Sequence, residues 1–214
     1  MVLIAFVLLL FLSILVALCR SYRRRHSTSV AKKCETVSLC AVLGSGGHTT
    51  EMLSLLEELS PKYTPRLYIV SKSDILSLKK VTVREMEQRK DGTFNFVYIS
   101  RSREVLQSYI TSIFTTLKAF LECLWIARTR TFDLLICNGP GTCIPVCFAV
   151  ALFDLVRLRN TKIVYFESIC RVERLSLSGK LLYFLGITDL FVVYWPELLE
   201  KYPKAKLITN LTTV

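Results

Sequence analysis

The alternation of short, continuous apolar runs with longer segments of helical periodicity is the feature that most constrains this fold. Strands that are apolar throughout are typical of sheets buried on both faces, and their alternation with helices is typical of parallel sheets. The sequence therefore predicts a doubly wound, Rossmann-like parallel α/β sheet. The expected strands span 37–43, 66–71, 94–99, 134–137, 163–166 and 190–194, and the expected helices span 50–59, 74–89, 104–128, 144–158 and 177–185.

Ligands of such sheets bind beyond the carboxyl ends of the strands, so the loops that follow strands directly are the informative ones. These loops span 44–49, 100–104, 138–142 and 167–173. Two of them contain glycine turns, and these two turns could face one crevice because the strand ends lie along one edge of the sheet.

The first glycine turn, Gly44-Ser45-Gly46-Gly47, follows a strand and opens a helix. Glycine permits positive φ and close approach of a ligand, and the unpaired N–H groups at a helix start favour an anion such as phosphate. No Gly-Lys-Ser/Thr follows, and Thr49 stands where a dinucleotide fingerprint has its third glycine. NAD binding is therefore disfavoured, while phosphate binding and a plain strand-to-helix turn both stay open.

His48 lies at the mouth of this turn. Its imidazole could pack at the helix start or bind neighbouring backbone groups. It could equally accept a proton or donate to a phosphate oxygen. Position alone leaves both roles open.

Two later loops carry polar groups at the same edge. Asn138, Gly139 and Gly141 form the second glycine turn, which either punctuates the chain before a helix or faces the same crevice as the first turn. Glu167 follows the fifth strand and presents a carboxylate there. The alternative for Glu167 is a helix cap or an ion pair with a nearby arginine.

Arg101 and Arg103 follow the third strand, where they form a solvated surface or balance the charge of a pyrophosphate. The expected helix 104–128 carries a stripe of leucine and aromatic residues. Such a stripe is most often part of a core, but it also suits a membrane surface or a lipid tail.

The N-terminus is apolar from Val2 to Cys19 apart from Ser13, and basic residues follow it. We interpret residues 1–20 as a transmembrane anchor and residues 21–34 as a basic linker. A cleaved signal peptide would have a basic start and a small-residue cleavage site, which this segment lacks. Because the positive cluster follows the span, the body should face the cytosol.

Composition narrows the function classes. The net charge is +11, and six of the positive residues fall between positions 20 and 33, so most of the asymmetry is explained by membrane orientation. No nucleic-acid-binding signature is present. The eight cysteines form no Cys-x-x-Cys pair and lie mostly in apolar runs, as buried thiols do in a reducing compartment, and two histidines make a zinc site improbable.

Five segments, read in order, resemble one known family: GSGGHTTEML, SRSREV, LLICNGPGTCIPVC, VYFESICRVERLSLSGKLLY and WPELLEKYPKA. That family is the membrane-anchoring subunit of the two-part glycosyltransferase of asparagine-linked glycosylation in the endoplasmic reticulum. The resemblance runs from about residue 37 to about residue 205, so it is far more specific than any single motif.

The resemblance implies that residues 35–205 are similar to the acceptor-binding, N-terminal half of a GT-B glycosyltransferase. A separate polypeptide, the donor-binding catalytic subunit, would bind UDP-GlcNAc. Together the two subunits would add the second N-acetylglucosamine, in β1,4 linkage, to GlcNAc-pyrophosphate-dolichol. No cofactor and no metal are expected.

The bacterial enzyme that makes lipid II is similar and carries both halves on one chain. Its first glycine loop ends in Gly-Gly-His, which matches Gly46, Gly47 and His48, and its second resembles residues 138–141. Its acidic residue after the fifth strand resembles Glu167. A histidine precedes that acid there, whereas Phe166 precedes it here.

The resemblance makes His48 the first candidate for the general base, or for a residue that orients the acceptor, and Glu167 the second. The acceptor sugar or its pyrophosphate is expected at Gly44, Ser45, Gly46, Gly47, Thr49, Asn138, Gly139, Gly141, Arg101 and Arg103.

The tail, residues 206–214, lacks the Gly-Arg that family members usually carry in a segment resembling a docking tail for the partner. Two alternatives stay open: a membrane anchor and scaffold without a chemical role, and a free-standing enzyme that binds UDP-GlcNAc alone. The expected location is the membrane of the endoplasmic reticulum and the continuous nuclear envelope. With a cytosolic body, the sequon at Asn210 should stay unmodified.

Overall fold

The computed structural model describes residues 36–88, 93–102, 107, 109–139, 141–156 and 160–208. The strands are β1 (Leu39–Val42), β2 (Arg66–Ser71), β3 (Phe94–Ile99), β4 (Leu134–Asn138), β5 (Lys162–Phe166), β6 (Leu190–Val193) and β7 (Lys206–Leu207). The helices are α2 (Gly47–Glu57), α3 (Ile75–Gln88), α4 (Tyr109–Thr129), α5 (Cys143–Leu155), α6 (Leu177–Phe184) and α7 (Pro196–Lys201).

All seven strands lie in one parallel sheet in the order β3-β2-β1-β4-β5-β6-β7. From β3 to β6 this is the strand order of the Rossmann fold, in which the chain reverses direction across the sheet between β1 and β4. The prediction of a doubly wound parallel α/β sheet is confirmed.

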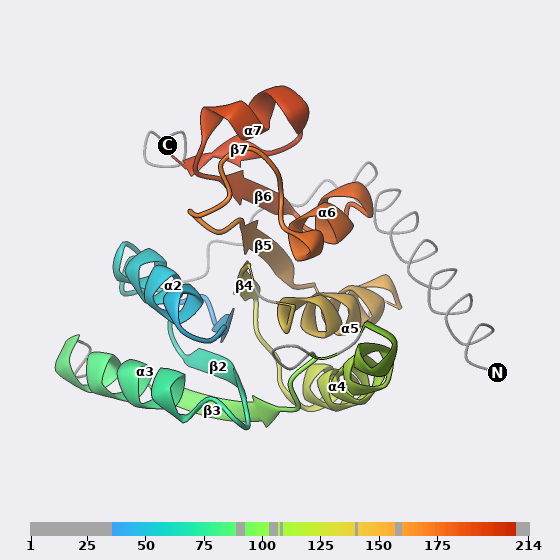
Figure 1. Cartoon of the computed structure of the whole chain (residues 1–214). Helices are drawn as coiled ribbons and strands as arrows, with labels where there is room; N and C mark the ends of the chain where they lie inside the picture. Colours follow the sequence, from blue (N-terminus) through green and yellow to red (C-terminus); the bar gives the residue numbers. More distant parts are fainter. Residues whose placement is uncertain are drawn as a thin grey trace.

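Helices cover both faces of the sheet (Figure 1). The helices α2 and α3 pack against one face, and α4, α5 and α6 pack against the other. Successive strand residues point to opposite faces, so Leu39 and Ala41 join the cluster under α2, while Cys40 and Val42 join the cluster under α4 and α5. Burial on both faces explains why the strands are apolar throughout.

Three details differ from the elements expected from the sequence. The helix α2 begins at Gly47 rather than near residue 50, which places His48 in its first turn. The sixth strand ends at Val193, and a helix that the sequence pattern did not predict, α7, follows it. Pro196 is the first residue of α7, where a missing N–H costs nothing. The two-residue strand β7, too short to be read from a sequence pattern, lies in the stretch expected as a tail and pairs with β6.

The expected anchor (1–20) and linker (21–34) lie outside the described residues. Among the residues that are described, no helix is both long and apolar enough to cross a membrane.

The apolar stripe of α4 is partly core and partly surface. Ala119, Cys123 and Ile126 are buried, whereas Phe114 and Trp125 are more than half exposed.

A charged cluster is buried beneath α3. The guanidinium of Arg66 donates to Glu85 Oε1 at 2.8 Å, and the hydroxyl of Tyr68 donates to the same oxygen at 2.5 Å. All three residues are at most 6% exposed. A buried charge is tolerated only when it is paired in this way, so the cluster holds α3 to β2 in one position.

Candidate functional site

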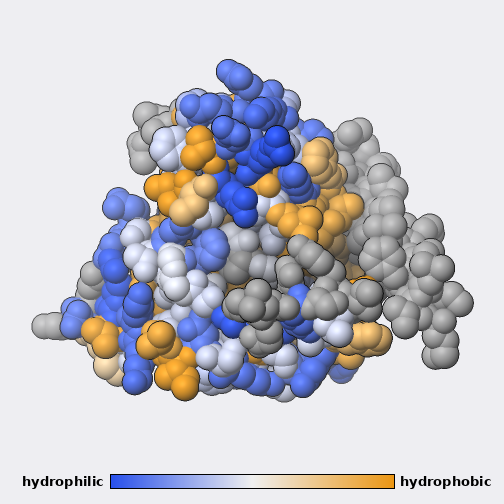
Figure 2. Space-filling view, viewed as in Figure 1, coloured by the Kyte–Doolittle hydropathy of each residue, from blue (hydrophilic) through white to orange (hydrophobic). Residues whose placement is uncertain are grey.

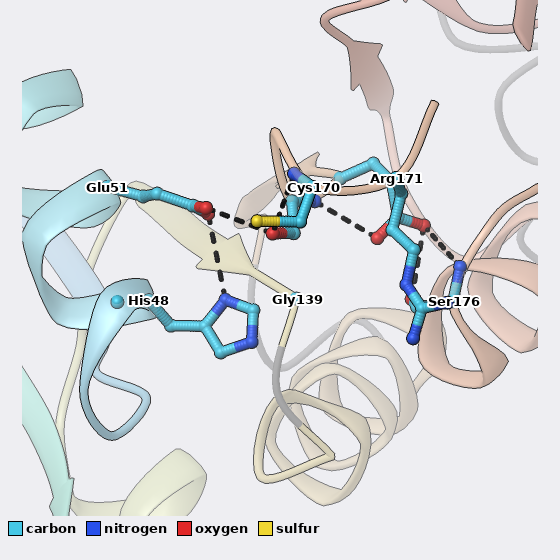
Figure 3. Close-up of a pocket in the computed structure, with 9 residues that line it drawn as sticks. His48, Glu51, Gly139, Cys170, Arg171 and Ser176 are labelled. Atoms are coloured by element: carbon cyan, nitrogen blue, oxygen red, sulfur yellow. Dashed lines mark hydrogen bonds and ion pairs between the residues drawn. The ribbon is translucent and has the colours of Figure 1, made fainter. Parts of the chain in front are cut away.

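A pocket of about 330 Å³ opens at the point where the strand order reverses, beyond the carboxyl ends of β1, β4 and β5. Open α/β sheets bind their ligands at this place. Figure 3 shows His48 and Glu51 on one side of the pocket and Cys170, Arg171 and Ser176 on the other. The lining residues are Gly47, His48, Glu51, Gly139, Glu167, Ser168, Cys170, Arg171 and Ser176.

The first glycine turn presents open backbone at the mouth of this pocket. Gly46 has φ of 65° and precedes α2 without a side-chain cap on the helix N–H groups. A Cβ atom at Gly46 or Gly47 would meet nothing within 4 Å, and both residues are exposed. The uncapped N–H groups and the helix dipole therefore favour an anion at this turn, while packing does not require glycine at position 47.

Other residues of the same turn have structural contacts. Thr49 is fully buried, and its hydroxyl donates to the carbonyl oxygen of Gly44 and lies 2.6 Å from Ser77 Oγ. These bonds join the turn to α3, so the structure places Gly44 and Thr49 beneath the pocket rather than in its lining. Ser45 is exposed beside them.

The second glycine turn meets the first through His48. The Nδ1 atom of His48 lies 3.0 Å from Asn138 Oδ1, and the imidazole rests directly on Gly139. A Cβ atom at Gly139 would lie 2.5 Å from His48 Cε1, and Gly139 also has φ of 61°. The expectation that the two turns face one crevice is therefore confirmed, and Gly139 is required by both its φ and the ring against it.

Glu51 follows His48 on the same face of α2 and connects it to the β5 loop. Its Oε1 accepts a hydrogen bond from Ser168 Oγ at 2.9 Å, and its Oε2 lies 3.6 Å from His48 Nδ1. The Oε2 atom is buried, and no residue within the described ranges donates a hydrogen bond to it. An acceptor-only group thus faces the ring nitrogen at the back of the pocket.

Glu167 organises the loop after β5. One carboxylate oxygen accepts from the Ser168 backbone N–H at 3.0 Å, and the other accepts from the Ser176 N–H at 2.9 Å and the Ser176 hydroxyl at 3.1 Å. Burial raises the pKa of the Glu167 carboxyl, while these hydrogen bonds and the charge of Arg171 oppose the rise. Gly179 packs so closely on the carboxylate that a Cβ there would overlap it.

The remaining expected residues have different positions. Gly141 is exposed, with nothing within 4 Å of a Cβ, and it lies outside the pocket lining. Arg101 is half-buried after β3 and is also outside the lining, and Arg103 lies outside the described residues. Among the described residues that line the pocket, the cation is instead Arg171, an exposed residue of the β5 loop.

These groups suit proton transfer beside an anion. Within the described part of the chain, Nε2 of His48 makes no hydrogen bond, so it is available to a ligand in the pocket. Backbone N–H groups of α2 and the guanidinium of Arg171 offer positive potential at the same place. The described residues contain no group of three His, Cys, Asp or Glu side chains placed to hold a metal ion.

Comparison with known proteins identifies the family of this sequence. The family described as "Oligosaccharide biosynthesis protein Alg14 like" matches residues 39–211. The chain belongs to the Alg14 family. A rat relative named "UDP-N-acetylglucosamine transferase subunit ALG14" is 45% identical over 177 residues, which cover 80% of this chain and 81% of the relative. The Yarrowia lipolytica protein of the same name is 40% identical, with 86% and 82% covered.

The fold of this Alg14-family chain also resembles a solved bacterial structure. The crystal structure of Acinetobacter baumannii MurG superposes with a TM-score of 0.50 at 12% identity. The match covers 75% of this chain but only 42% of that one. At this identity the likeness concerns the fold alone.

Sequence reasoning missed five of the lining residues as parts of a site. Ser168, Cys170 and Arg171 lie in a loop that the strand-end rule had marked as informative, but nothing in their residue types distinguished them. Ser176 caps α6 by accepting from the Gly179 N–H, a role visible only in the structure. A signal for Glu51 was present, since a carboxylate three residues after His48 lies on the same helix face.

Proposed function

We propose that this chain is the acceptor-side, membrane-anchoring subunit of the β1,4-N-acetylglucosaminyltransferase that acts on GlcNAc-pyrophosphate-dolichol with UDP-GlcNAc as donor. Family membership carries the proposal, since relatives covered over about four fifths of their length are named subunits of a UDP-N-acetylglucosamine transferase. Because these relatives are named as subunits, we infer a separate partner protein, which on this proposal binds UDP-GlcNAc. The reaction then takes place between the two proteins.

The pocket supports the acceptor side of this division. A lipid-linked sugar pyrophosphate needs a place for negative charge next to a group that can take a proton from a hydroxyl. The α2 N-terminus and Arg171 supply the first, and His48 supplies the second. On this proposal Gly46 and Gly47 bind the acceptor through backbone N–H groups.

The step itself can be written so that it balances. The 4-hydroxyl of the acceptor sugar forms a bond to the anomeric carbon of the donor, and the bond from that carbon to the UDP oxygen breaks with inversion. The hydroxyl proton passes to His48 Nε2, and the electron pair of the broken bond leaves on UDP, on the partner's side. His48 suits this role better than Glu167, because both oxygens of Glu167 already accept hydrogen bonds from its own loop.

Membrane placement is part of the same proposal. The apolar segment 2–19 with basic residues after it supports a single-pass anchor with the body on the cytosolic side of the endoplasmic reticulum. Apolar side chains also gather over α6, where Leu177 and Phe184 are both more than 70% exposed (Figure 2). Absence of an endoglycosidase-sensitive mass shift at Asn210 is the expected result for this orientation.

Reconstituted sugar transfer tests the proposal. The full chain, in detergent or liposomes, is given UDP-GlcNAc and a GlcNAc-pyrophosphate-lipid with and without the donor-binding partner, and His48→Ala is measured beside the wild type. We expect product only when both proteins are present, and a loss of about 10²- to 10⁴-fold in kcat for His48→Ala with the partner still bound.

Each other outcome identifies one of the alternatives. Transfer by this chain alone would place the donor site here and overturn the division between subunits. Full activity of His48→Ala, with the partner bound, would reduce this chain to an anchor and scaffold. The His26→Ala variant is the matched control, because His26 is the other of the two histidines and lies in the basic linker.

A further inference from the structure

Glu51 is a half-buried carboxylate whose buried Oε2 atom faces the proposed base. Its side chain is 16% exposed, and its Oε2 lies 3.6 Å from His48 Nδ1 and receives no hydrogen bond from the described residues. Its Oε1 is already engaged by the Ser168 hydroxyl at 2.9 Å. The carboxylate is therefore held in place from the β5 loop while its second oxygen faces the imidazole.

Two acceptors consequently surround one ring nitrogen. Asn138 Oδ1 lies 3.0 Å from His48 Nδ1, and Glu51 Oε2 faces the same atom. A neutral imidazole carries its hydrogen on one nitrogen and a lone pair on the other. With the hydrogen on Nδ1 both contacts are attractive, whereas a lone pair on Nδ1 would face a negative charge at the back of the pocket.

Asn138 alone cannot select between these two forms of the ring. Rotation of its amide by half a turn would present the NH₂ group to Nδ1 and favour the opposite form. Among the residues that the structure describes, none is a hydrogen-bond partner of the buried Asn138 Nδ2 atom, so no other described contact fixes the amide. The carboxylate of Glu51 has no such second orientation, because both of its oxygens only accept.

We propose that Glu51 is a positioning residue that holds neutral His48 in the Nδ1–H form and thereby keeps the Nε2 lone pair directed into the pocket. The catalytic part of this inference rests on the proposed function, in which Nε2 takes the acceptor's proton. Once the proton has transferred, the same carboxylate stabilises the imidazolium. The geometric part stands on the contacts of His48 alone.

The other charged and titratable groups around this pair leave that role to Glu51. Glu167 and Arg171 line the pocket from the β5 loop, and the positive charge of Arg171 acts on the Glu167 carboxyl. Cys170 is exposed in the same loop. Tyr194 directly follows β6. Burial, and after it the negative charge of Glu51, raise the pKa of Tyr194 to about 12.

Nitrogen NMR of the histidine rings tests the geometric part directly. The protein contains only two histidines, so His26→Ala leaves His48 as the single imidazole signal. At a pH where the ring is neutral, the ¹⁵N shifts of the full chain should show a hydrogen on Nδ1 and a lone pair on Nε2. The inference is overturned if the hydrogen lies on Nε2.

The test variant is Glu51→Gln, whose amide oxygen can still accept from Ser168. It should lose the preference for Nδ1–H, while Glu57→Gln, the same change at the far end of α2 where Glu57 pairs with Arg84, should keep it. An unchanged preference in Glu51→Gln would also overturn the inference. Circular dichroism and thermal melting of both variants show that the fold is retained.

Kinetics with the partner subunit then separate the inference from the proposed function. Glu51→Gln should lower kcat by about 10²-fold with little change in KM, and Glu51→Asp should recover part of the loss, whereas Glu57→Gln should be unaffected. A lost tautomer preference with full turnover would overturn the catalytic part and remove His48 as base. A fall in kcat with the preference intact would overturn the role assigned to Glu51 and leave His48 in place.

Discussion

Gly139→Ala should separate the conformational role of the second glycine turn from its role in placing His48. A Cβ at this position would lie 2.5 Å from His48 Cε1 and 2.8 Å from Nδ1. Non-bonded carbon atoms rest about 3.5 Å apart, so the ring must retreat by about 1 Å. A misplacement of about 1 Å in a reacting group can lower the rate about 10²-fold, which is the loss of kcat that we expect.

The loss of stability can be estimated separately. An alanine held at φ near that of Gly139 costs about 1–2 kcal/mol, and losing the His48–Asn138 hydrogen bond adds about 1 kcal/mol. Gly186→Ala is the matched control, because Gly186 has φ of 60° and open space where a Cβ would go. It should lose about 1–2 kcal/mol of unfolding free energy and keep its turnover.

The assays are denaturant unfolding of each variant and sugar transfer with the partner subunit. If Gly139→Ala acts by displacing His48, combining it with His48→Ala should slow the reaction no further than His48→Ala alone. Equal turnover of Gly139→Ala and Gly186→Ala would refute the reasoning. So would losses that simply multiply in the double variant.

Two further predictions concern buried carboxylates. Glu85→Ala should lower the unfolding free energy by about 3–5 kcal/mol in denaturant titrations, because it leaves the Arg66 guanidinium buried without its partner; a loss near that of an exposed Glu57→Ala would contradict this. Glu167 has a folded-state pKa above its ordinary value, so between those two values the folded state holds a proton that the unfolded state has released, and stability should fall as pH rises through that window. Glu167→Gln should remove that fall when the unfolding free energy is measured across pH. If the free energies of wild type and variant changed in parallel with pH, the Glu167 carboxyl would not be the source of the fall.

Much of the architecture could be predicted from local sequence. Continuous apolar runs such as that at β1 report burial on both faces, and the helical segments between them require parallel strands. The glycine turns after β1 and β4 could be placed at one edge of the sheet for the same reason. The apolar pattern does not mark the start of α2, because this helix begins directly after Gly46, whereas its apolar residues begin later.

What only the tertiary structure decided is which distant side chains meet. Gly139 reads as turn punctuation until β4 pairs with β1, which brings the His48 ring against it from 91 positions away in the chain. Thr49 and Glu51 are two residues apart in one helix, yet one faces Ser77 beneath the pocket and the other faces His48 and Ser168 within it. Local pattern determined the elements because backbone geometry and burial are periodic. The site depended on strand order, because its contacts join segments that are far apart in the sequence, and no periodic pattern links such segments.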